Sequence, residues 1–363
     1  MSSLNSASST IHMDDYRLER LNEENSEDWD FLNDHAPDGS ILHSLRWKRV
    51  VEMTSDIQEQ YTLLYKNDKV FGIFPFVEEK FRLFRGLRAA FDPRRLHAVL
   101  KDNSDPFAMD CVIRQVPLYE RRLRKLSYLQ ISTLHEETLN TISSRPLINL
   151  PRIGDMVLDL SQNPPDLLWD TFSARRGQRK FIRRFDEHGF SITEIHSSEH
   201  LKDFYMYYKE NMEHNKYRPQ PFSRFTDICR YMSGDIRITL LSKRDIVAGG
   251  MLMMLEKTRG RVSTIYLSLN RNLPNTYHAP YYLWWDAINW AWDHDYSRIS
   301  FGAVHGQDEK DPRYRIKYDL GARFQPIYSG LIPLRRAYSM NMEWDAWRKN
   351  RRSSTHESSD VFY

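Results

Sequence analysis

Two stretches of the chain share one pattern: YTLLYKNDKVFG at residues 61–72 and ITLLSKRDIVAG at residues 238–249. Threonine, two leucines, lysine, aspartate, valine and glycine recur in register, at a constant offset of 177 residues. Each copy joins two apolar runs through a charged turn, as a β-hairpin does, and a helix-like stretch precedes it, at 44–53 and 222–232. The offset has the size of a domain, not of a solenoid unit, so the pattern predicts a duplicated domain. Chance similarity between hairpins is the alternative.

The second half continues with elements of a mixed α/β fold. The sequence predicts strands at 261–269 and 298–304, and the segment 281–296 between them has apolar residues at helical spacing. A loop then leads to a short helix that carries Lys317, and a last strand is predicted at 324–334. Strand pairs followed by a strand–helix–strand unit predict two α/β (α+β) domains, each a central mixed sheet flanked by helices.

We expect these domains to be contiguous in the sequence. A chain of 363 residues favours two domains over one. The predicted N-terminal domain covers 16–154 and the C-terminal domain covers 155–335. The polar segment 1–15 is expected to be a disordered leader, and 336–363 a C-terminal helix and tail.

Composition narrows the functional classes. The net charge is only +3, so the chain cannot coat nucleic acid as a global polycation, and any basic site must be local. Cys111 and Cys229 fit no zinc or redox spacing, which favours two buried thiols in a reducing compartment. The N-terminus lacks the features of a signal peptide, and the longest apolar run, 247–255, is too short to span a bilayer. We therefore expect a cytoplasmic protein, with the inner face of the membrane as a second possible location.

Several quoted stretches follow one another in an order that resembles a known family. They are ILHSLRWKRVVE (41–52), YKNDKVFGIFPF (65–76), MVLDLSQNPPDLLWDTFSARRGQRKFIRRFDEHGF (156–190), FYMYYKENMEHNKYRPQPFSRF (204–225), APYYLWWDAINWAWDHDYSRISFGAV (279–304) and RIKYDLGARFQPIY (315–328). From about residue 29 to 334 the chain resembles the Fem family of peptidoglycan-bridge aminoacyltransferases and their FemAB-like relatives, which consist of two tandem GNAT-type domains.

The chain departs from the family pattern at three points. Ser300 stands in ISFG where the family often has an aspartate, and Ile316 replaces the phenylalanine before the family's lysine. The glycine-rich loop that binds the acyl-CoA pyrophosphate in ordinary GNAT enzymes is not visible. These departures leave open whether the activity is altered or lost.

The resemblance implies an acyltransferase, in which an amine attacks an ester or thioester carbonyl. A preorganised cation at the resulting oxyanion supplies much of the catalysis in such reactions. Lys317 is the candidate for this role, against the alternative of a surface lysine at a helix end. His305 is the first candidate for the general base and Asp308 the second, although polar loops carry such residues routinely.

Further candidate residues belong to substrate binding. In the basic segment 173–185, Arg176, Lys180 and Arg183 share one helical face that could bind phosphates, while Phe181 and Phe185 share another. A solvated face is the equal alternative.

Two further pairs of neighbouring residues are candidates for substrate binding. Tyr217 and Arg218 fall where the family has a loop beside the acceptor channel, and Arg218 could instead cap the preceding helix. Trp47 and Lys48 complete the predicted substrate-binding residues.

The leading prediction is an N-acyltransferase of FemAB-like type that acts on an amine of a peptidoglycan, other cell-envelope or surface-polysaccharide precursor. The donor is expected to be aminoacyl-tRNA or acyl-CoA, and the basic segment slightly favours aminoacyl-tRNA. We expect no bound cofactor, no metal ion and no DNA partner. One alternative is a CoA-dependent acyltransferase acting on an amino sugar or small amine. Another is a non-catalytic adaptor that binds an anionic polymer or RNA.

Overall fold

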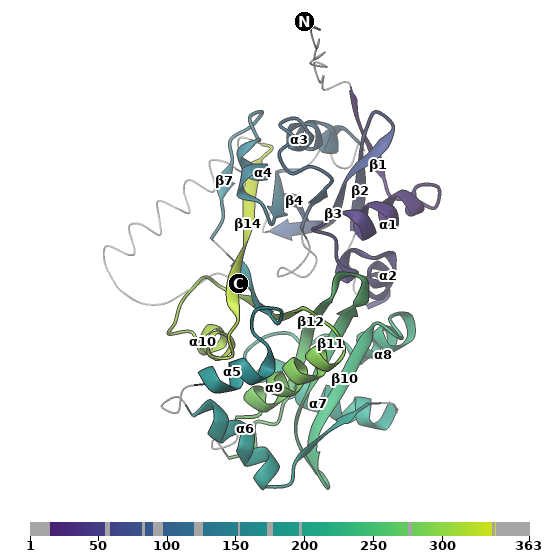
Figure 1. The fold of residues 1–363 in the computed structure, drawn as a ribbon. Coiled ribbons are helices and arrows are strands. Elements are labelled where there is room, and N and C mark those ends of the chain that lie inside the picture. Colours follow the sequence, from purple (N-terminus) through teal and green to yellow (C-terminus); the bar gives the residue numbers. More distant parts are fainter. Residues whose placement is uncertain are drawn as a thin grey trace, which may run out of the picture. The chain divides into compact units, whose positions relative to one another are not determined.

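A computed structural model describes residues 15–54, 59–81, 84–89, 97–119, 126–151, 153–172, 177–195, 198–274, 278–335 and 338 (Figure 1). The expected leader and tail lie outside these residues, apart from Asp15 and Tyr338. The chain divides into two compact units. Unit 1 draws on residues 1–38, 57–150 and 328–363, and unit 2 on residues 39–56 and 151–327.

Unit 1 is built around a mixed sheet with the strand order β1-β2-β3-β4-β6-β14, in which β5 also pairs with β3 and β7 with β14. Its strands are β1 (Tyr16–Arg20), β2 (Glu59–Lys66), β3 (Lys69–Phe81), β4 (Phe84–Ala89), β5 (Val99–Leu100), β6 (Tyr128–Thr133), β7 (Ile148–Asn149) and the second part of β14 (Arg323–Pro333). Its helices are α1 (Ser26–His35), α3 (Ala108–Tyr119) and α4 (Glu136–Asn140).

Helices cover the sheet of unit 1. Apolar residues of α3, among them Val112 and Ile113, are fully buried in one core cluster with Phe74, Leu87 and Leu129 from the strands. The α1 helix packs against β3. Side chains of β2 and β6 are buried almost continuously, as expected for strands of a sheet that is covered on both faces.

Unit 2 contains a second mixed sheet, with the strand order β14-β8-β13-β12-β11-β10-β9. Its strands are the first part of β14, β8 (Ile153–Asp159), β9 (Ser191–Glu194), β10 (Ile236–Lys243), β11 (Ile246–Glu256), β12 (Arg261–Leu269) and β13 (Arg298–Val304). Its helices are α2 (Leu45–Thr54), α5 (Pro165–Thr171), α6 (Gln178–Glu187), α7 (Ser198–His214), α8 (Phe222–Tyr231), α9 (Ala279–Asp293) and α10 (Pro312–Asp319), with 3-10 turns at Ile41–His43 and Lys257–Arg259.

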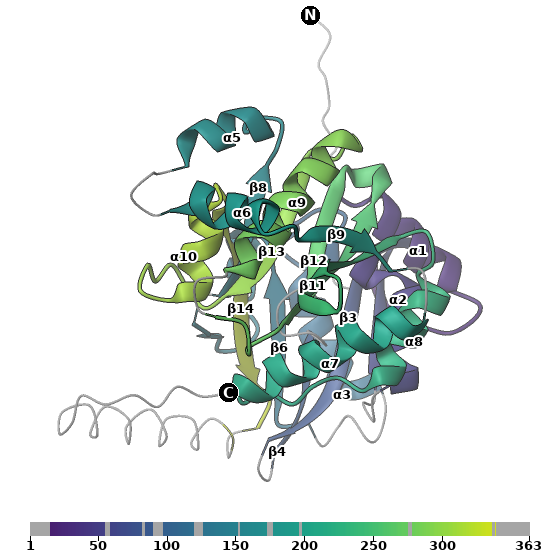
Figure 2. The same ribbon diagram turned by 90° about the horizontal axis from the view of Figure 1, so that it is seen from below.

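Two groups of helices pack against the sheet of unit 2. Figure 2 shows α6 next to α9, and the rings of Phe185 and Tyr282 join them at 5.3 Å. This pair and α5 contribute to one large core cluster with strand residues such as Met251 and Ile299. The α7 helix packs against β11 and β12, with Tyr208 on Tyr266 at 5.3 Å. The predicted α/β fold of two tandem units is therefore confirmed.

The repeated sequences at 61–72 and 238–249 form the β2–β3 and β10–β11 hairpins, which share structural details. Each has a β-bulge, at Leu64/Tyr65 in the β2–β3 pair and at Leu241/Ser242 in the β10–β11 pair, and these sites are again 177 residues apart. The α2 and α8 helices begin at residues 45 and 222, which keeps the same offset. In both units the next strand then pairs in parallel, β4 with β6 and β12 with β13. These shared details support duplication over chance similarity.

The units differ from the expected contiguous domains, because segments are exchanged between the two halves of the sequence. In unit 1, β6 pairs with residues 328–333 from the end of β14. In unit 2, the equivalent strand β13 pairs with β8, which directly follows the first half of the sequence. The segment 39–56, with α2, also belongs to unit 2, where Arg224 of α8 donates a hydrogen bond to Thr54 at 2.8 Å.

Candidate active site

The parallel strands β12 and β13 pair over only three residues. Residues 261–263 pair with 298–300, although both strands continue beyond this point. The Thr264 hydroxyl then donates to the Ser300 carbonyl oxygen at 3.0 Å and takes the place of the next ladder bond. The strand-to-strand pairing on this side of β13 therefore ends just before Gly302.

Gly302 forms a β-bulge in β13. The register between β13 and β8 shifts between Ser300 and Ala303, and Gly302 has a φ of 82°. Left-handed backbone costs other residues about 1–2 kcal/mol, so glycine suits this position. The Gly302 N–H donates to the Ser300 hydroxyl oxygen at 3.2 Å.

The side chain of Lys317 lies against this bulge. Asp311 caps the start of α10, which carries Lys317 in its last turn. The lysine Nζ donates to the carbonyl oxygens of Gly302 at 2.8 Å and Ala303 at 3.3 Å, and it lies 6.0 Å from the centre of the Trp284 ring. Lys317 is 7% exposed, so it is a buried cation held by hydrogen bonds and not a solvated edge residue.

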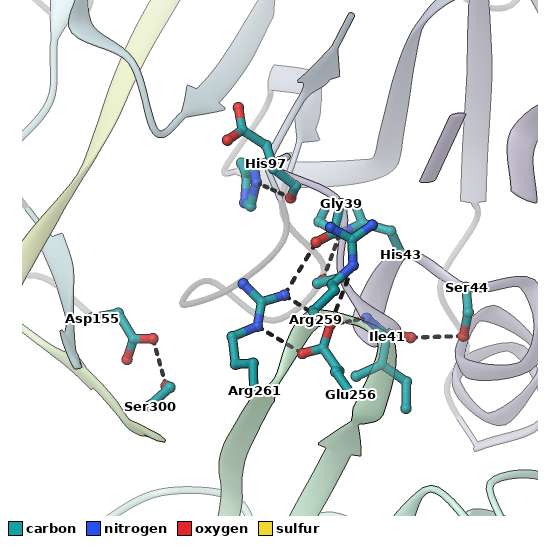
Figure 3. Close-up of polar contacts among 12 residues, drawn as sticks. Gly39, Ile41, His43, Ser44, His97, Asp155, Glu256, Arg259, Arg261 and Ser300 are labelled. Carbon is teal, nitrogen blue, oxygen red and sulfur yellow. Dashed lines mark hydrogen bonds and ion pairs between the residues drawn. The ribbon is translucent and has the colours of Figure 1, made fainter. Parts of the chain in front are cut away.

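A carboxylate from a neighbouring strand reaches Ser300, the residue that replaces the family's aspartate. The Ser300 hydroxyl donates to Oδ2 of Asp155 on β8, as Figure 3 shows. The second carboxylate oxygen, Oδ1, is buried and has no hydrogen-bond partner among the described residues. Sequence reasoning missed Asp155, because its partner lies 145 positions away and only the β8–β13 pairing brings them together.

The predicted bases His305 and Asp308 lie in the exposed loop after β13. The Asp308 carboxylate accepts the backbone N–H of Lys310 at 2.8 Å, and its carbonyl accepts that of Asp311 at 3.0 Å. Asp308 therefore shapes the turn before α10. The assignment of either residue as a base stays a prediction.

Tyr217 contacts the start of α10, whereas Arg218 is exposed. The Arg313 guanidinium donates to the Tyr217 hydroxyl at 3.2 Å and to the Asp311 carboxylate at 2.9 Å. Partial burial works to raise the pKa of Asp311, but hydrogen bonds from Arg313 outweigh it and hold that pKa below its ordinary value. Arg218 has no hydrogen bond or ion pair among the described residues.

The basic segment forms the helix α6, with the two faces that its spacing predicts. Phe185 is buried, while Lys180 and Arg183 are exposed; Arg176 lies outside the described residues. The Arg183 guanidinium lies 5.5 Å from the centre of the Trp169 ring. The exposed face of α6 thus presents two cations to solvent.

The predicted residues Trp47 and Lys48 lie on the α2 helix. Trp47 is 1% exposed, and its buried indole N–H has no hydrogen-bond partner among the described residues, so its role in substrate binding stays a prediction. The sequence pattern could not distinguish a buried from a groove-lining tryptophan. Lys48 forms an ion pair with Glu52 one turn further along the helix.

Sequence reasoning also missed a polar cluster around Glu256, at the end of β11. The Glu256 carboxylate accepts hydrogen bonds from the Ile41 N–H at 2.9 Å and from Arg261 at 2.8 and 2.9 Å (Figure 3). Arg261 also donates to the Gly39 carbonyl at 3.1 Å, and Arg259 lies 3.9 Å from the carboxylate. The cluster holds the start of the segment 39–56 within unit 2.

The chain resembles known proteins in part of its sequence and in its fold. Residues 173–314 match the sequence model of the family described as Acetyltransferase (GNAT) domain. No curated protein sequence matches the chain significantly. Among solved structures, FemX is 13% identical with a TM-score of 0.63, covering 86% of this chain and 96% of its own.

Two further structures have a similar fold. A tandem GNAT protein from the clavulanic acid biosynthesis pathway is 11% identical with a TM-score of 0.54, covering 88% of this chain and 98% of its own. The C-terminal domain of a putative lysylphosphatidylglycerol synthetase from Agrobacterium fabrum is 12% identical with a TM-score of 0.54, covering 88% of this chain and 94% of its own.

The fold of the described residues is that of tandem GNAT proteins, and residues 173–314 resemble a GNAT acetyltransferase domain. The resemblance to FemAB-like tandem GNAT proteins is thereby confirmed for the fold. Within the described residues, no helix combines the length and apolar character needed to cross a membrane. The same residues contain no group of three or more His, Cys, Asp or Glu side chains placed to hold a metal ion.

Proposed function

We propose that the protein is an N-acyltransferase that moves an aminoacyl or acyl group to an amine of a cell-envelope or surface-polysaccharide precursor. The observation that carries this proposal is the buried Lys317 ammonium at the β13 bulge, where parallel pairing has just ended. The similarity in fold to FemX, and to the lysylphosphatidylglycerol synthetase domain, supports the choice of aminoacyl chemistry and of an envelope substrate.

The proposed reaction forms one amide bond and breaks one ester or thioester bond. The acceptor amine attacks the donor carbonyl carbon, and the carbonyl oxygen takes up the electron pair as an oxyanion. When the intermediate collapses, the ribose oxygen of tRNA or the thiolate of CoA leaves, and the proton lost by the amine neutralises it. The positive charge of Lys317 stabilises the oxyanion electrostatically, because burial weakens screening by water. His305 and Asp308 are the candidates that would receive the amine proton first.

The donor in this proposal is aminoacyl-tRNA, with acyl-CoA as the alternative that the first assay must separate. Both are polyanions, so the exposed cations Lys180 and Arg183 of α6 are proposed to contact donor phosphates. Arg218, exposed beside the Tyr217–Arg313 contact, is proposed to bind a phosphate or carboxylate of the acceptor. The proposed location is the cytoplasm or its membrane face.

The test measures transfer of a radiolabelled acyl group from aminoacyl-tRNA or from acetyl-CoA. Acceptors are a muramyl peptide with a free side-chain amine, and glucosamine. Lys317→Ala is expected to lower kcat about 100- to 1000-fold. The matched control is Lys310→Ala, which removes an exposed lysine seven residues earlier and should leave kcat unchanged. Wild-type protein that binds a donor but transfers from neither would favour the adaptor alternative, and full turnover by Lys317→Ala would refute the catalytic assignment.

A further inference from the structure

Three hydrogen bonds connect Asp155 to the Lys317 ammonium through the bulge. The Ser300 hydroxyl donates to the Asp155 carboxylate, the Gly302 N–H donates to the Ser300 hydroxyl oxygen, and Lys317 donates to the Gly302 carbonyl. In the order Asp155, Ser300, Gly302 and Lys317, each residue is therefore hydrogen-bonded to the one that follows it. The first three lie on two paired strands, and the lysine lies on α10.

These three hydrogen bonds run through a part of β13 in which backbone pairing with β12 and β8 is incomplete. Pairing with β12 ends at Ser300, and pairing with β8 is interrupted until Ala303. The peptide groups around Gly302 thus depend on side-chain hydrogen bonds for their orientation. Ser300 is 2% exposed, so water cannot readily replace its hydroxyl in this role.

We propose that Asp155 and Ser300 are positioning residues for Lys317: they anchor the Gly302 N–H and so fix the backbone of the bulge, whose next peptide group presents the Gly302 carbonyl to the ammonium. Asp155 supplies from β8 the carboxylate that the ISFG segment itself lacks. The part of this inference that concerns turnover rests on the proposed function, whereas the part that concerns geometry does not.

The geometric part is tested without any substrate. In protein labelled with ¹³C and ¹⁵N at lysine, the Lys317 ammonium is assigned as the resonance lost in Lys317→Arg, and its proton exchange rate is measured by NMR. Wild-type protein should show a slowly exchanging ammonium. Ser300→Ala and Asp155→Ala should each accelerate exchange at least tenfold, and Ser300→Thr, which keeps a hydroxyl, should restore slow exchange.

The chain offers a matched control on the same strand. Asp159 of β8 also accepts a serine hydroxyl, that of Ser161, but no hydrogen bond joins this pair to residues 300–303 in the described part of the chain. Asp159→Asn and Ser161→Ala should leave the Lys317 exchange rate unchanged. An unchanged rate in Ser300→Ala, or equal acceleration in the control variants, would overturn the inference.

The functional part is tested with the donor that supports transfer. Ser300→Ala and Asp155→Ala should each lower kcat about tenfold, the usual size of one lost hydrogen bond, with KM within about twofold of wild type. The double variant should be no slower than either single variant, because one broken link already releases the backbone of the bulge at the Gly302 N–H. An effect that multiplies to about 100-fold would instead mean independent roles and would overturn the inference.

These outcomes separate the two proposals. If Lys317→Ala abolishes transfer but both serine and aspartate variants turn over normally, only the positioning inference fails. If Lys317→Ala turns over normally, the catalytic assignment fails, while the NMR result still decides the geometry. Should Asp155→Ala not fold, as judged by circular dichroism, Ser300→Ala and Ser300→Thr carry the test.

Discussion

Gly302 and Gly306 both have left-handed backbone, with φ of 82° and 75°, but only Gly302 holds the Lys317 side chain. Gly302→Ala and Gly306→Ala should therefore each lower the free energy of unfolding by about 1–2 kcal/mol, measured in urea. Transfer activity should fall sharply in Gly302→Ala alone. If both variants lose activity equally, strain in the loop and not the bulge carbonyl is responsible.

Asp105 in unit 1 allows a prediction about pH. The residue is buried, and its carboxylate accepts the Tyr16 hydroxyl at 2.7 and 2.8 Å and forms an ion pair with Lys66. Burial works to raise the pKa of Asp105, but the bonds from Lys66 and Tyr16 and the backbone N–H of Phe107 hold it below the ordinary 3.8. The carboxylate therefore stabilises the fold at pH values above 3.8, and this contribution disappears as the pH falls through the lowered pKa.

Urea unfolding between pH 6 and pH 2 tests this linkage. The wild-type free energy of unfolding should decrease towards the acid end, and Asp105→Asn should be less stable at pH 6 and show a smaller decrease. Asp308→Asn, an exposed aspartate of the loop before α10, is the control and should follow the wild-type curve. Parallel curves for wild type and Asp105→Asn would contradict the prediction.

At the residue scale, the sequence singled out some candidate site residues and missed others for a physical reason. Lys317 was identifiable, because it lies between apolar neighbours before a glycine turn and matches a family motif. Asp155 and Glu256 were not, because strand pairing and burial bring them to partners 145 and 215 positions away. The burial of Trp47 was not predictable, because a tryptophan in a helix has the same pattern whether it is buried or lines a groove.

At the element scale, sequence periodicity was more informative. The predicted strands 261–269 and 298–304 coincide with β12 and β13, and the helix predicted at 281–296 is α9, shifted by two to three residues. Local patterns suffice there, because each element buries its own apolar face. The sequence did not predict the bulge at Gly302, since its φ depends on contacts with β8 and α10.

The α6 helix leads to a prediction about donor binding. Lys180→Glu with Arg183→Glu should weaken binding to tRNA, measured by fluorescence anisotropy, and reduce the slope of log K against log salt by about 2. The matched control is Lys202→Glu with Lys209→Glu, which reverses two exposed lysines on α7. Equal weakening in both double variants would indicate non-specific attraction and not a donor site on α6.

At the scale of the whole molecule, the exchanged strands decide what can fold alone. A fragment of residues 15–150 lacks the strand 328–333, with which β6 and β7 pair in unit 1. We expect this fragment to show no cooperative thermal unfolding. Joining residue 150 through a short turn to 328–335 should restore it, because β7 and β14 are already antiparallel. Cooperative unfolding of the unjoined fragment would contradict the prediction.

The sequence repeat indicated two domains but not the exchange between them. The repeat covers the hairpins, which are local, and it carries no information about which sheet β8 and β14 join. The predicted boundary at 154/155 assigned β8 to the C-terminal domain, which agrees with unit 2, but it also assigned residues 328–333 of β14 there, although these pair with β6 in unit 1.

The same strand exchange has a consequence for synthesis on the ribosome. Domains usually fold in the order in which they emerge, starting from the N-terminus. Here the sheet of the unit made first stays incomplete until residues 328–333 have been translated, so its unpaired strand edge remains open throughout elongation. A nascent chain of this kind is an expected client of chaperones that shield such edges.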